Sequence, residues 1–250
     1  MTPTITAVPC LRDNYAYLVH DGDTAWVVDP SESAPVVAAL ARLGLRAAGV
    51  LATHHHVDHT GGIEGLIAHF GTMPVAAHAL DRGRVPAQSL FIDAPADRFI
   101  AVGLTIAGCQ VLAAHIPGHT RAAIAWYLVG ADDAAGSGDA DGDVFTGDTL
   151  FAAGCGRLFE GTPAQMHSSL QLLCGLPVAT RLWFGHEYTA ANLRFAAAVE
   201  PGHTPIAVRA EHLALCTTPT TVALERATNP FVRARDAIEL GERRAAKDTF

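Results

Sequence analysis

The run Thr53-His54-His55-His56-Val57-Asp58-His59 decides how the rest of this 250-residue sequence is interpreted. It follows directly on the short apolar segment 48–52, which is predicted to be a strand. In an extended chain residues i and i+2 share a face, so His54 and His56 can reach one metal ion while His55 faces away. Asp58 and His59 stand where a helix is expected to begin and can reach a second ion. Since the ions of two-metal hydrolytic sites lie about 3.5–4 Å apart, the run predicts two halves of one centre.

Three later motifs offer the further ligands that the two halves need. Each one places its ligand after a strand-like segment: Ile116-Pro117-Gly118-His119-Thr120, Phe145-Thr146-Gly147-Asp148-Thr149 and Phe184-Gly185-His186-Glu187. Asp148 has two carboxylate oxygens and can bridge two cations. We therefore expect the first ion at His54, His56 and His119, the second ion at Asp58, His59 and His186, and Asp148 between them.

Imidazole and carboxylate ligands suit zinc, and also iron or manganese. The predicted cofactor is two divalent ions per chain, with zinc as the first choice. The charge of two such ions exceeds that of Asp58 and Asp148, and the excess favours a bridging hydroxide. Because metal binding lowers the pKa of water to about 7, this hydroxide is the expected nucleophile at neutral pH.

The composition excludes several classes of protein. The net charge of −8 argues against nucleic acid as a partner, and we expect no membrane span because long uninterrupted apolar runs are missing. Five scattered cysteines without a CxxC pair, and a start that resembles no signal peptide, predict a cytoplasmic protein. Residues 1–186 hold 9 Arg against 17 acidic residues, whereas residues 187–250 hold 8 residues of each sign. Cations for an anionic ligand are therefore expected mainly from the C-terminal part.

The pattern along the chain predicts a mixed α/β fold. Strands are expected at 4–8, 15–20, 24–28, 48–52, 75–77, 104–106, 110–114, 123–129, 144–146 and 181–184, and helices at 34–43, 61–70, 164–173, 190–198 and 205–215, before a charged tail. The aspartate-rich stretch Gly130–Asp143 is predicted to be a solvated loop. We place a boundary near His186, which separates a catalytic domain, 1–186, from a small helical domain, 187–250.

The H-x-H-x-D-H run with its later His, Asp and His resembles the metallo-β-lactamase-fold superfamily. That resemblance implies an αββα sandwich over residues 1–186. Longer stretches resemble glyoxalase II, the hydroxyacylglutathione hydrolases, and cover nearly the whole chain: 10–15, 147–157, 159–162, 185–189, 229–231 and 244–248. The resemblance implies hydrolysis of S-D-lactoylglutathione to D-lactate and glutathione, the second step of methylglyoxal detoxification. It also implies that the helical domain helps to bind glutathione, and we expect a monomer.

Carried over by position, the resemblance assigns the glutathione contacts to Arg157, Tyr188, Arg244 and Lys247. Arg and Lys match the two carboxylates of glutathione, which gives this assignment a physical basis. Phe159 stands where the family often has Tyr, so a hydroxyl contact to glutathione is expected to be missing. The cost should be about 1 kcal/mol of binding, without loss of the chemistry.

Two further residues near the predicted site have competing interpretations. For Asp29 the sequence leaves two interpretations open. Either it accepts a hydrogen bond from a ligand histidine, or it is a turn residue before Pro30. Cys155 is assigned to packing, because a hydroxide nucleophile makes a thiol nucleophile unnecessary.

Three other functions compete with the thioesterase. A persulfide dioxygenase of the same superfamily would hold a single iron, so metal stoichiometry and oxygen consumption would distinguish it. A nuclease conflicts with the acidic charge balance. A metal-dependent binding protein without activity would leave a complete ligand set unused.

Overall fold

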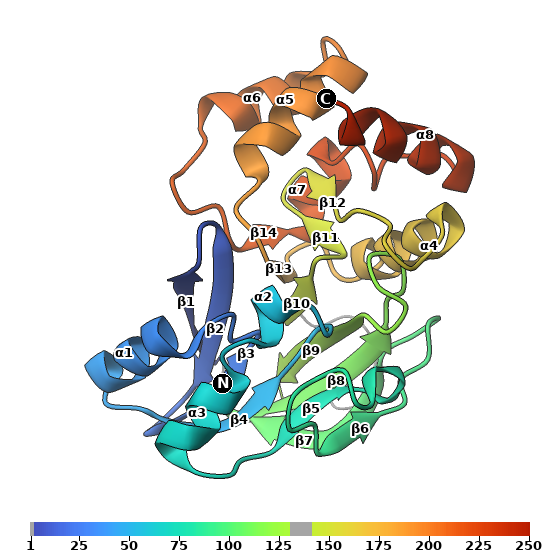
Figure 1. Cartoon of the computed structure of the whole chain (residues 1–250). Helices are drawn as coiled ribbons and strands as arrows, with labels where there is room; N and C mark the ends of the chain where they lie inside the picture. Colours follow the sequence, from blue (N-terminus) through green and yellow to red (C-terminus); the bar gives the residue numbers. More distant parts are fainter. Residues whose placement is uncertain (1–2, 131–141) are drawn as a thin grey trace.

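Two six-stranded sheets pack face to face in the computed structural model, which describes residues 3–130 and 142–250 (Figure 1). The first sheet has the order β1(Thr4–Cys10), β2(Asn14–His20), β3(Thr24–Val28), β4(Arg46–Leu51), β5(Val75–His78) and β6(Leu90–Ile92). The second has the order β14(Thr220–Thr221), β13(Arg181–Phe184), β10(Asp143–Gly147), β9(Ile124–Gly130), β8(Cys109–His115) and β7(Ile100–Ile106). A short hairpin, β11(Leu150–Phe151) and β12(Gly154–Cys155), stands apart from both sheets.

Helices cover the outer faces of both sheets. The first sheet carries α1(Ser33–Leu43) and α3(Ile63–Phe70), with the single turns α2(Val57–Thr60) and η1(Ala79–Asp81) at its edge. The second carries α4(Pro163–Cys174) on its outer face. The C-terminal helices α5(Thr189–Val199), α6(Thr204–Glu211), α7(Val222–Thr228) and α8(Ala237–Asp248) gather beyond the end of the sandwich, around the hairpin and α4. Among the described residues, no helix is long and apolar enough to cross a membrane.

Three layers of buried apolar side chains hold this sandwich together. One layer lies between α1, α3 and the first sheet, one between the two sheets, and one between the second sheet and α4 with the C-terminal helices. Strand β9 shows why both of its faces are apolar. Trp126 and Leu128 face the first sheet, whereas Tyr127 and Val129 face α4. The αββα sandwich with a helical C-terminal part, and with it the α/β class, is confirmed.

The fold gathers the predicted ligands because their strands run in the same direction. Strands β3 and β4 are parallel, as are β10 and β13. The carboxyl ends of parallel strands meet at one edge of a sheet, and these four ends lead to Asp29, the Thr53–His59 run, Asp148 and His186. The two sheets are joined at this edge, where the Trp126 indole donates to the Ala52 carbonyl at 3.1 Å.

The C-terminal part of the chain grips the β11–β12 hairpin through its backbone. Five backbone polar atoms of the hairpin bond to side chains from beyond residue 187. These are Asn229 Nδ2 to the carbonyls of Phe151 (3.2 Å) and Gly154 (2.9 Å), Asn192 Nδ2 to that of Ala152 (3.0 Å), Arg244 Nη1 to that of Cys155 (2.8 Å), and the Ala153 amide to Glu225 Oε2 (2.8 Å). The grip gives these backbone groups side-chain partners in addition to the pairing between the two short strands.

Most predicted strands and helices are confirmed to within a few residues. The helix predicted at 61–70 begins later, at Ile63. The two glycines before it, Gly61 and Gly62, lie against the backbone of residues 30–33, where a side chain would collide. The expected charged tail is helix α8, capped by Asp236, which accepts hydrogen bonds from the amides of Ile238 (3.0 Å) and Glu239 (2.9 Å). The predicted loop at 130–143 falls mostly outside the described residues. The domain boundary at His186 stays a prediction.

Asn229→Ala should lower the free energy of unfolding by about 2–4 kcal/mol, because it removes the side-chain donor to two carbonyls of the hairpin and the acceptor of the buried Phe231 amide. Asn192→Ala removes one such donor and should cost about half as much. Urea unfolding followed by circular dichroism measures both. Equal costs, or a larger cost at Asn192, would contradict the proposed weight of Asn229.

Candidate metal centre and substrate pocket

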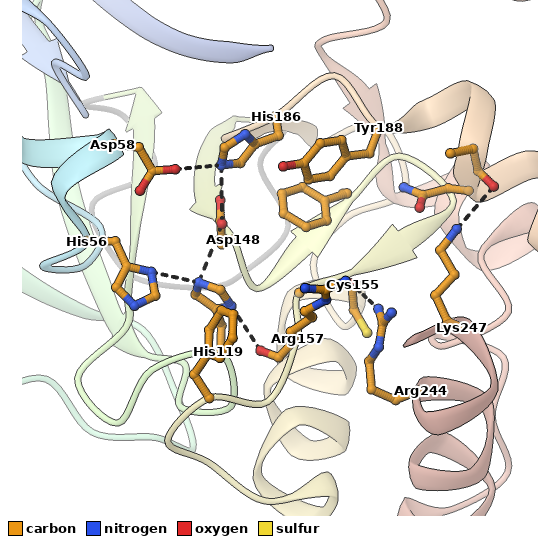
Figure 2. Close-up of a pocket in the computed structure, with 15 residues that line it drawn as sticks. His56, Asp58, His119, Asp148, Cys155, Arg157, His186, Tyr188, Arg244 and Lys247 are labelled. Atoms are coloured by element: carbon orange, nitrogen blue, oxygen red, sulfur yellow. Dashed lines mark hydrogen bonds and ion pairs between the residues drawn. The ribbon is translucent and has the colours of Figure 1, made fainter. Parts of the chain in front are cut away.

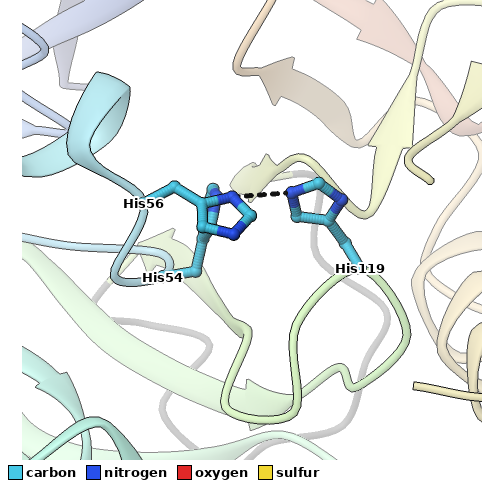
Figure 3. A group of neighbouring side chains, drawn as sticks. All are labelled: His54, His56 and His119. Atoms are coloured by element: carbon cyan, nitrogen blue, oxygen red, sulfur yellow. Dashed lines mark hydrogen bonds between the residues drawn. The ribbon is translucent and has the colours of Figure 1, made fainter. Parts of the chain in front are cut away.

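The first predicted half-site is assembled by two loops (Figure 3). His56 Nδ1 lies 3.1 Å from His54 Nε2 and 3.1 Å from His119 Nε2. His54 and His119 are buried, and His56 is partly exposed toward the pocket. The Pro-Gly turn before His119 requires glycine, because Gly118 has φ 155° and a Cβ there would lie 2.9 Å from Met166 of α4.

The second half-site brings Asp58 and His59 of α2 to His186, which follows β13. His186 Nε2 lies 3.3 Å from His59 Nε2 and 3.4 Å from Asp58 Oδ2. In each half-site the three ligand atoms all lie within 4.8 Å of one another. A single cation can therefore contact all three atoms of a half-site.

Asp148 lies between the half-sites, as predicted for a bridging ligand. Its Oδ1 is 3.2 Å from His59 Nε2, and its Oδ2 is 3.4 Å from both His119 Nε2 and His186 Nε2 (Figure 2). Gly185 makes this approach possible. A Cβ at position 185 would lie 2.4 Å from Asp148 Oδ1 and 2.6 Å from the His59 ring.

The hydrogen bonds around the histidines favour metal binding. A neutral imidazole has one N–H donor, and a partner at one nitrogen leaves the other as an acceptor. The nitrogens that point away from the centre have such partners. They are Thr53 Oγ1 for His54 (3.1 Å), Asp29 Oδ2 for His59 (2.9 Å), the Arg157 carbonyl for His119 (2.9 Å) and Asp13 Oδ1 for His186 (2.8 Å). The nitrogens that face the centre are thus left with lone pairs.

The buried Asp148 Oδ1 also faces the centre, and none of the described residues hydrogen-bonds to it. Lone pairs of nitrogen and oxygen that converge in a buried place repel one another unless a cation lies among them. The donor set therefore fits divalent metal ions of the zinc, iron or manganese type.

The pKa shifts divide the centre into two electrostatic environments. Burial lowers the pKa of His54, His56 and His119, so these imidazoles are neutral and ready to coordinate. At His186 burial also lowers the pKa, but the carboxylates of Asp148 and Asp58 outweigh it and raise the pKa to about 10. The second half-site therefore attracts positive charge, which a metal ion supplies when it displaces the proton.

Asp29 combines the two roles between which the sequence left the choice open. Its φ of 47° is a turn conformation that few residues adopt. Its carboxylate also accepts hydrogen bonds from His59 Nδ1 (2.9 Å), the Thr53 amide (2.7 Å) and the Thr53 hydroxyl (2.6 Å). The turn places the carboxylate where it can orient His59.

Two residues of the β1–β2 turn take part in the site, although the sequence analysis assigned them no role. Asp13 orients His186, and Asn14 Nδ2 donates to the Asp58 carbonyl at 2.9 Å and to Asp58 Oδ2 at 3.3 Å. The stretch 10–15 contributed only to the family resemblance. The signal that could have identified Asp13 and Asn14 is the polar pair itself, which stands where one strand gives way to the next.

A pocket of about 520 Å³ extends from the metal-ligand cluster to the C-terminal helices (Figure 2). The five predicted substrate-binding residues all line it: Arg157, Phe159, Tyr188, Arg244 and Lys247. At the metal end it is lined by His56, Asp58, His119, Asp148 and His186. One cavity thus joins the metal-ligand cluster to a cationic end.

The cations at the far end are held to different degrees. Arg244 is buried and donates to the Cys155 carbonyl at 2.8 Å, and Lys247 donates to the Ala191 carbonyl at 3.1 Å. The Arg157 side chain is 63% exposed. The side chains of Arg244 and Lys247 are therefore held in the wall of the pocket, whereas the side chain of Arg157 is exposed to solvent.

Aromatic rings line the path between the two ends. The Tyr188 ring stacks on His186 with centroids 4.8 Å apart, and Phe151 packs edge-on against Tyr188 at 5.3 Å. The Phe159 ring is 5.3 Å from the His119 ring and 62% exposed. Burial raises the pKa of Cys155 to about 11, so its thiol stays protonated, in keeping with a packing role.

Comparisons with known proteins agree with this arrangement. The family model described as "Metallo-beta-lactamase superfamily" matches residues 11–186, and the one described as "Hydroxyacylglutathione hydrolase C-terminus" matches residues 187–250. A protein named hydroxyacylglutathione hydrolase from Synechococcus sp. (strain PCC 6301) is 45% identical over 92% of this chain and 88% of its own length. A protein of the same name from Gloeothece citriformis is 40% identical over 98% and 99%.

Solved structures with this fold include the BLEG-1 B3 metallo-β-lactamase, with a TM-score of 0.63 and 22% identity over 92% of this chain and 99% of that one. They also include TTHA1623 in a di-iron-bound form, with a TM-score of 0.56 and 26% identity over 92% and 100%. The fold and the family models define the metallo-β-lactamase class. Within that superfamily, the chain belongs to the hydroxyacylglutathione hydrolases, the glyoxalase II family.

Asp29→Asn should weaken metal binding at the His59 half-site about 10- to 100-fold, because an amide cannot accept all three hydrogen bonds of the carboxylate. Asn tolerates the positive φ, so the turn itself is kept. Metal content is measured after dialysis against a weak chelator, with the exposed Asp97→Asn as the control. Wild-type metal content in Asp29→Asn would assign Asp29 to the turn alone.

Proposed function

We propose that this protein hydrolyses S-D-lactoylglutathione to D-lactate and glutathione. The observation that carries the proposal is the single pocket, which has a metal-ligand cluster at one end and Arg157, Arg244 and Lys247 at the other. A glutathione thioester has the same division, with a carbonyl to be attacked at one end and carboxylates at the other. The curated relatives named hydroxyacylglutathione hydrolase support this substrate.

The residues of the two half-sites would hold two divalent ions, with zinc as our first choice and iron or manganese as alternatives. The di-iron form of TTHA1623 supports a site for two ions. When bound, the ions would lower the pKa of water, so that hydroxide is available at neutral pH, and would stabilise negative charge on the carbonyl oxygen. In this proposal the carboxylates of Asp58 and Asp148 would help to hold the two cations beside the reacting carbonyl. Asp29 and Asp13 keep the imidazoles of His59 and His186 in place.

The remaining pocket residues orient the substrate. Arg244 and Lys247 are anchored in the wall and meet the carboxylates of the glutathione moiety, and Tyr188 lies beside His186, between the two ends. The glutathione thiol has a pKa of about 8.5, so the leaving thiolate needs little protonation. We also propose that the protein acts as a cytoplasmic monomer.

Chelation should abolish hydrolysis of S-D-lactoylglutathione, followed at the thioester absorbance, and readdition of Zn²⁺, Mn²⁺ or Fe²⁺ should restore it. Metal analysis of the active protein should give two ions per chain, because the half-sites each offer three ligands. Full activity in a metal-free sample would disprove the proposal. One ion per chain, together with oxygen consumption on glutathione persulfide, would favour the dioxygenase.

Phe159→Tyr should lower the KM for S-D-lactoylglutathione up to about 5-fold, the equivalent of one neutral hydrogen bond, and leave kcat within about 2-fold. The ring is exposed in the pocket, so a hydroxyl on it gains access to the substrate without a clash. Steady-state kinetics measure both constants, and Phe159→Leu serves as a control without a hydroxyl. An unchanged or higher KM in Phe159→Tyr would refute the expectation.

The KM should rise as the pH passes about 8. Burial, with the nearby Arg244 and Arg194, lowers the pKa of Lys247 to about 8, so this cation loses its proton above that pH and no longer attracts a carboxylate. Lys247→Arg should move the rise to a higher pH, because the guanidinium keeps its charge. The same KM profile in both proteins, measured from pH 7 to 9, would rule out this role for Lys247.

A further inference from the structure

The carboxylate of Asp248 joins two cations of the pocket. Its Oδ1 lies 3.0 Å from Arg244 Nη2 and 3.4 Å from Arg157 Nε. Arg244 belongs to α8, whereas Arg157 belongs to the loop after β12. Asp248 itself does not line the pocket, and its side chain is 42% exposed.

Asp248 contributes little to the stability of its own helix, α8. It is the last residue of α8, where unsatisfied carbonyls make a negative charge unfavourable. Arg244 precedes it by four residues, which is the less favourable order for a helical ion pair. The contact with the two arginines therefore calls for an explanation outside the stability of the helix.

The two arginines differ in how firmly they are held. Arg244 is buried and fixed by the Cys155 carbonyl, so it provides a rigid support for Asp248. Arg157 has a long, exposed side chain that loses rotamer freedom when a substrate orders it. A chain of contacts thus runs from the Cys155 carbonyl through Arg244 and Asp248 to Arg157.

We propose that Asp248 is a positioning residue for substrate binding. Supported by Arg244, it orders the Arg157 guanidinium at the mouth of the pocket, ready to receive a carboxylate of the glutathione moiety. This inference rests on the proposed function, since it concerns the same substrate. It differs from a competitor role, in which the Asp248 carboxylate would occupy the cations and its removal would tighten binding.

A double-mutant cycle tests the inference on the intact, metal-loaded protein. Asp248→Asn should raise the KM for S-D-lactoylglutathione about 3-fold and leave kcat unchanged. In an Arg157→Ala background the same substitution should leave the KM unchanged, because the residue through which Asp248 acts is gone. Glu242→Gln removes one negative charge from the exposed face of the same helix and should change neither constant.

A lower or unchanged KM in Asp248→Asn would overturn the inference, as would an equal rise in the Arg157→Ala background. A falling unfolding temperature in Asp248→Asn would also overturn it, because that result indicates a structural role.

The dissociation constant of S-methylglutathione, measured by calorimetry on the same proteins, should follow the same pattern as the KM. If the wild type binds this thioether but cleaves no thioester, the proposed function fails and calorimetry decides on Asp248. If the wild type does neither, both proposals fail.

Discussion

The buried carboxylate of Asp148 is the constraint on which the site depends. A buried charge is costly unless it is surrounded by compensating groups. His59, His119 and His186, which three separate segments bring within 3.4 Å of its oxygens, form the donor set that would hold a compensating cation. Carboxylates and imidazoles alternate outward from it, since Asp29 holds His59 and Asp13 holds His186. Movement of any one of these segments would leave a buried charge uncompensated.

The cationic end of the pocket depends on a different principle, because it is built where two parts of the chain meet. The metal ligands follow strands of the sandwich, whereas Arg244 and Lys247 come from α8. Strand β14 adds the C-terminal part to the second sheet, and the hairpin β11–β12 is held by side chains from that part. The helical region is therefore an integral wall of the site, in addition to being a source of charges.

Most of the correct predictions of helices and strands came from patterns that are local in the sequence. The ligand histidines stand in short motifs after apolar strands, and period-2 and helical spacing located most elements of the sandwich. Contacts between residues that are distant in the sequence have no such local pattern. Asp13 and its partner His186 are 173 positions apart, and no local pattern joins them. Helix α8 was expected only as a charged tail, because just Leu240 and Arg244 of its residues are buried and the apolar stripe is correspondingly short. Arg157, Tyr188 and Lys247 were located through family resemblance, since a lone cation carries no local signal.

The grip on the β11–β12 hairpin has a consequence for how this pocket can change. Within the hairpin, the hydrogen bonds of Asn229, Asn192 and Arg244 go to main-chain carbonyls, which every amino acid supplies alike. The shape of the hairpin is thus maintained without reference to the identity of its side chains. Phe151 and Cys155 both line the pocket, and the hydrogen bonds to their carbonyls do not depend on which side chains stand there. The hairpin therefore offers a place where selection, or a protein engineer, can alter the shape of the pocket while the metal ligands are left untouched.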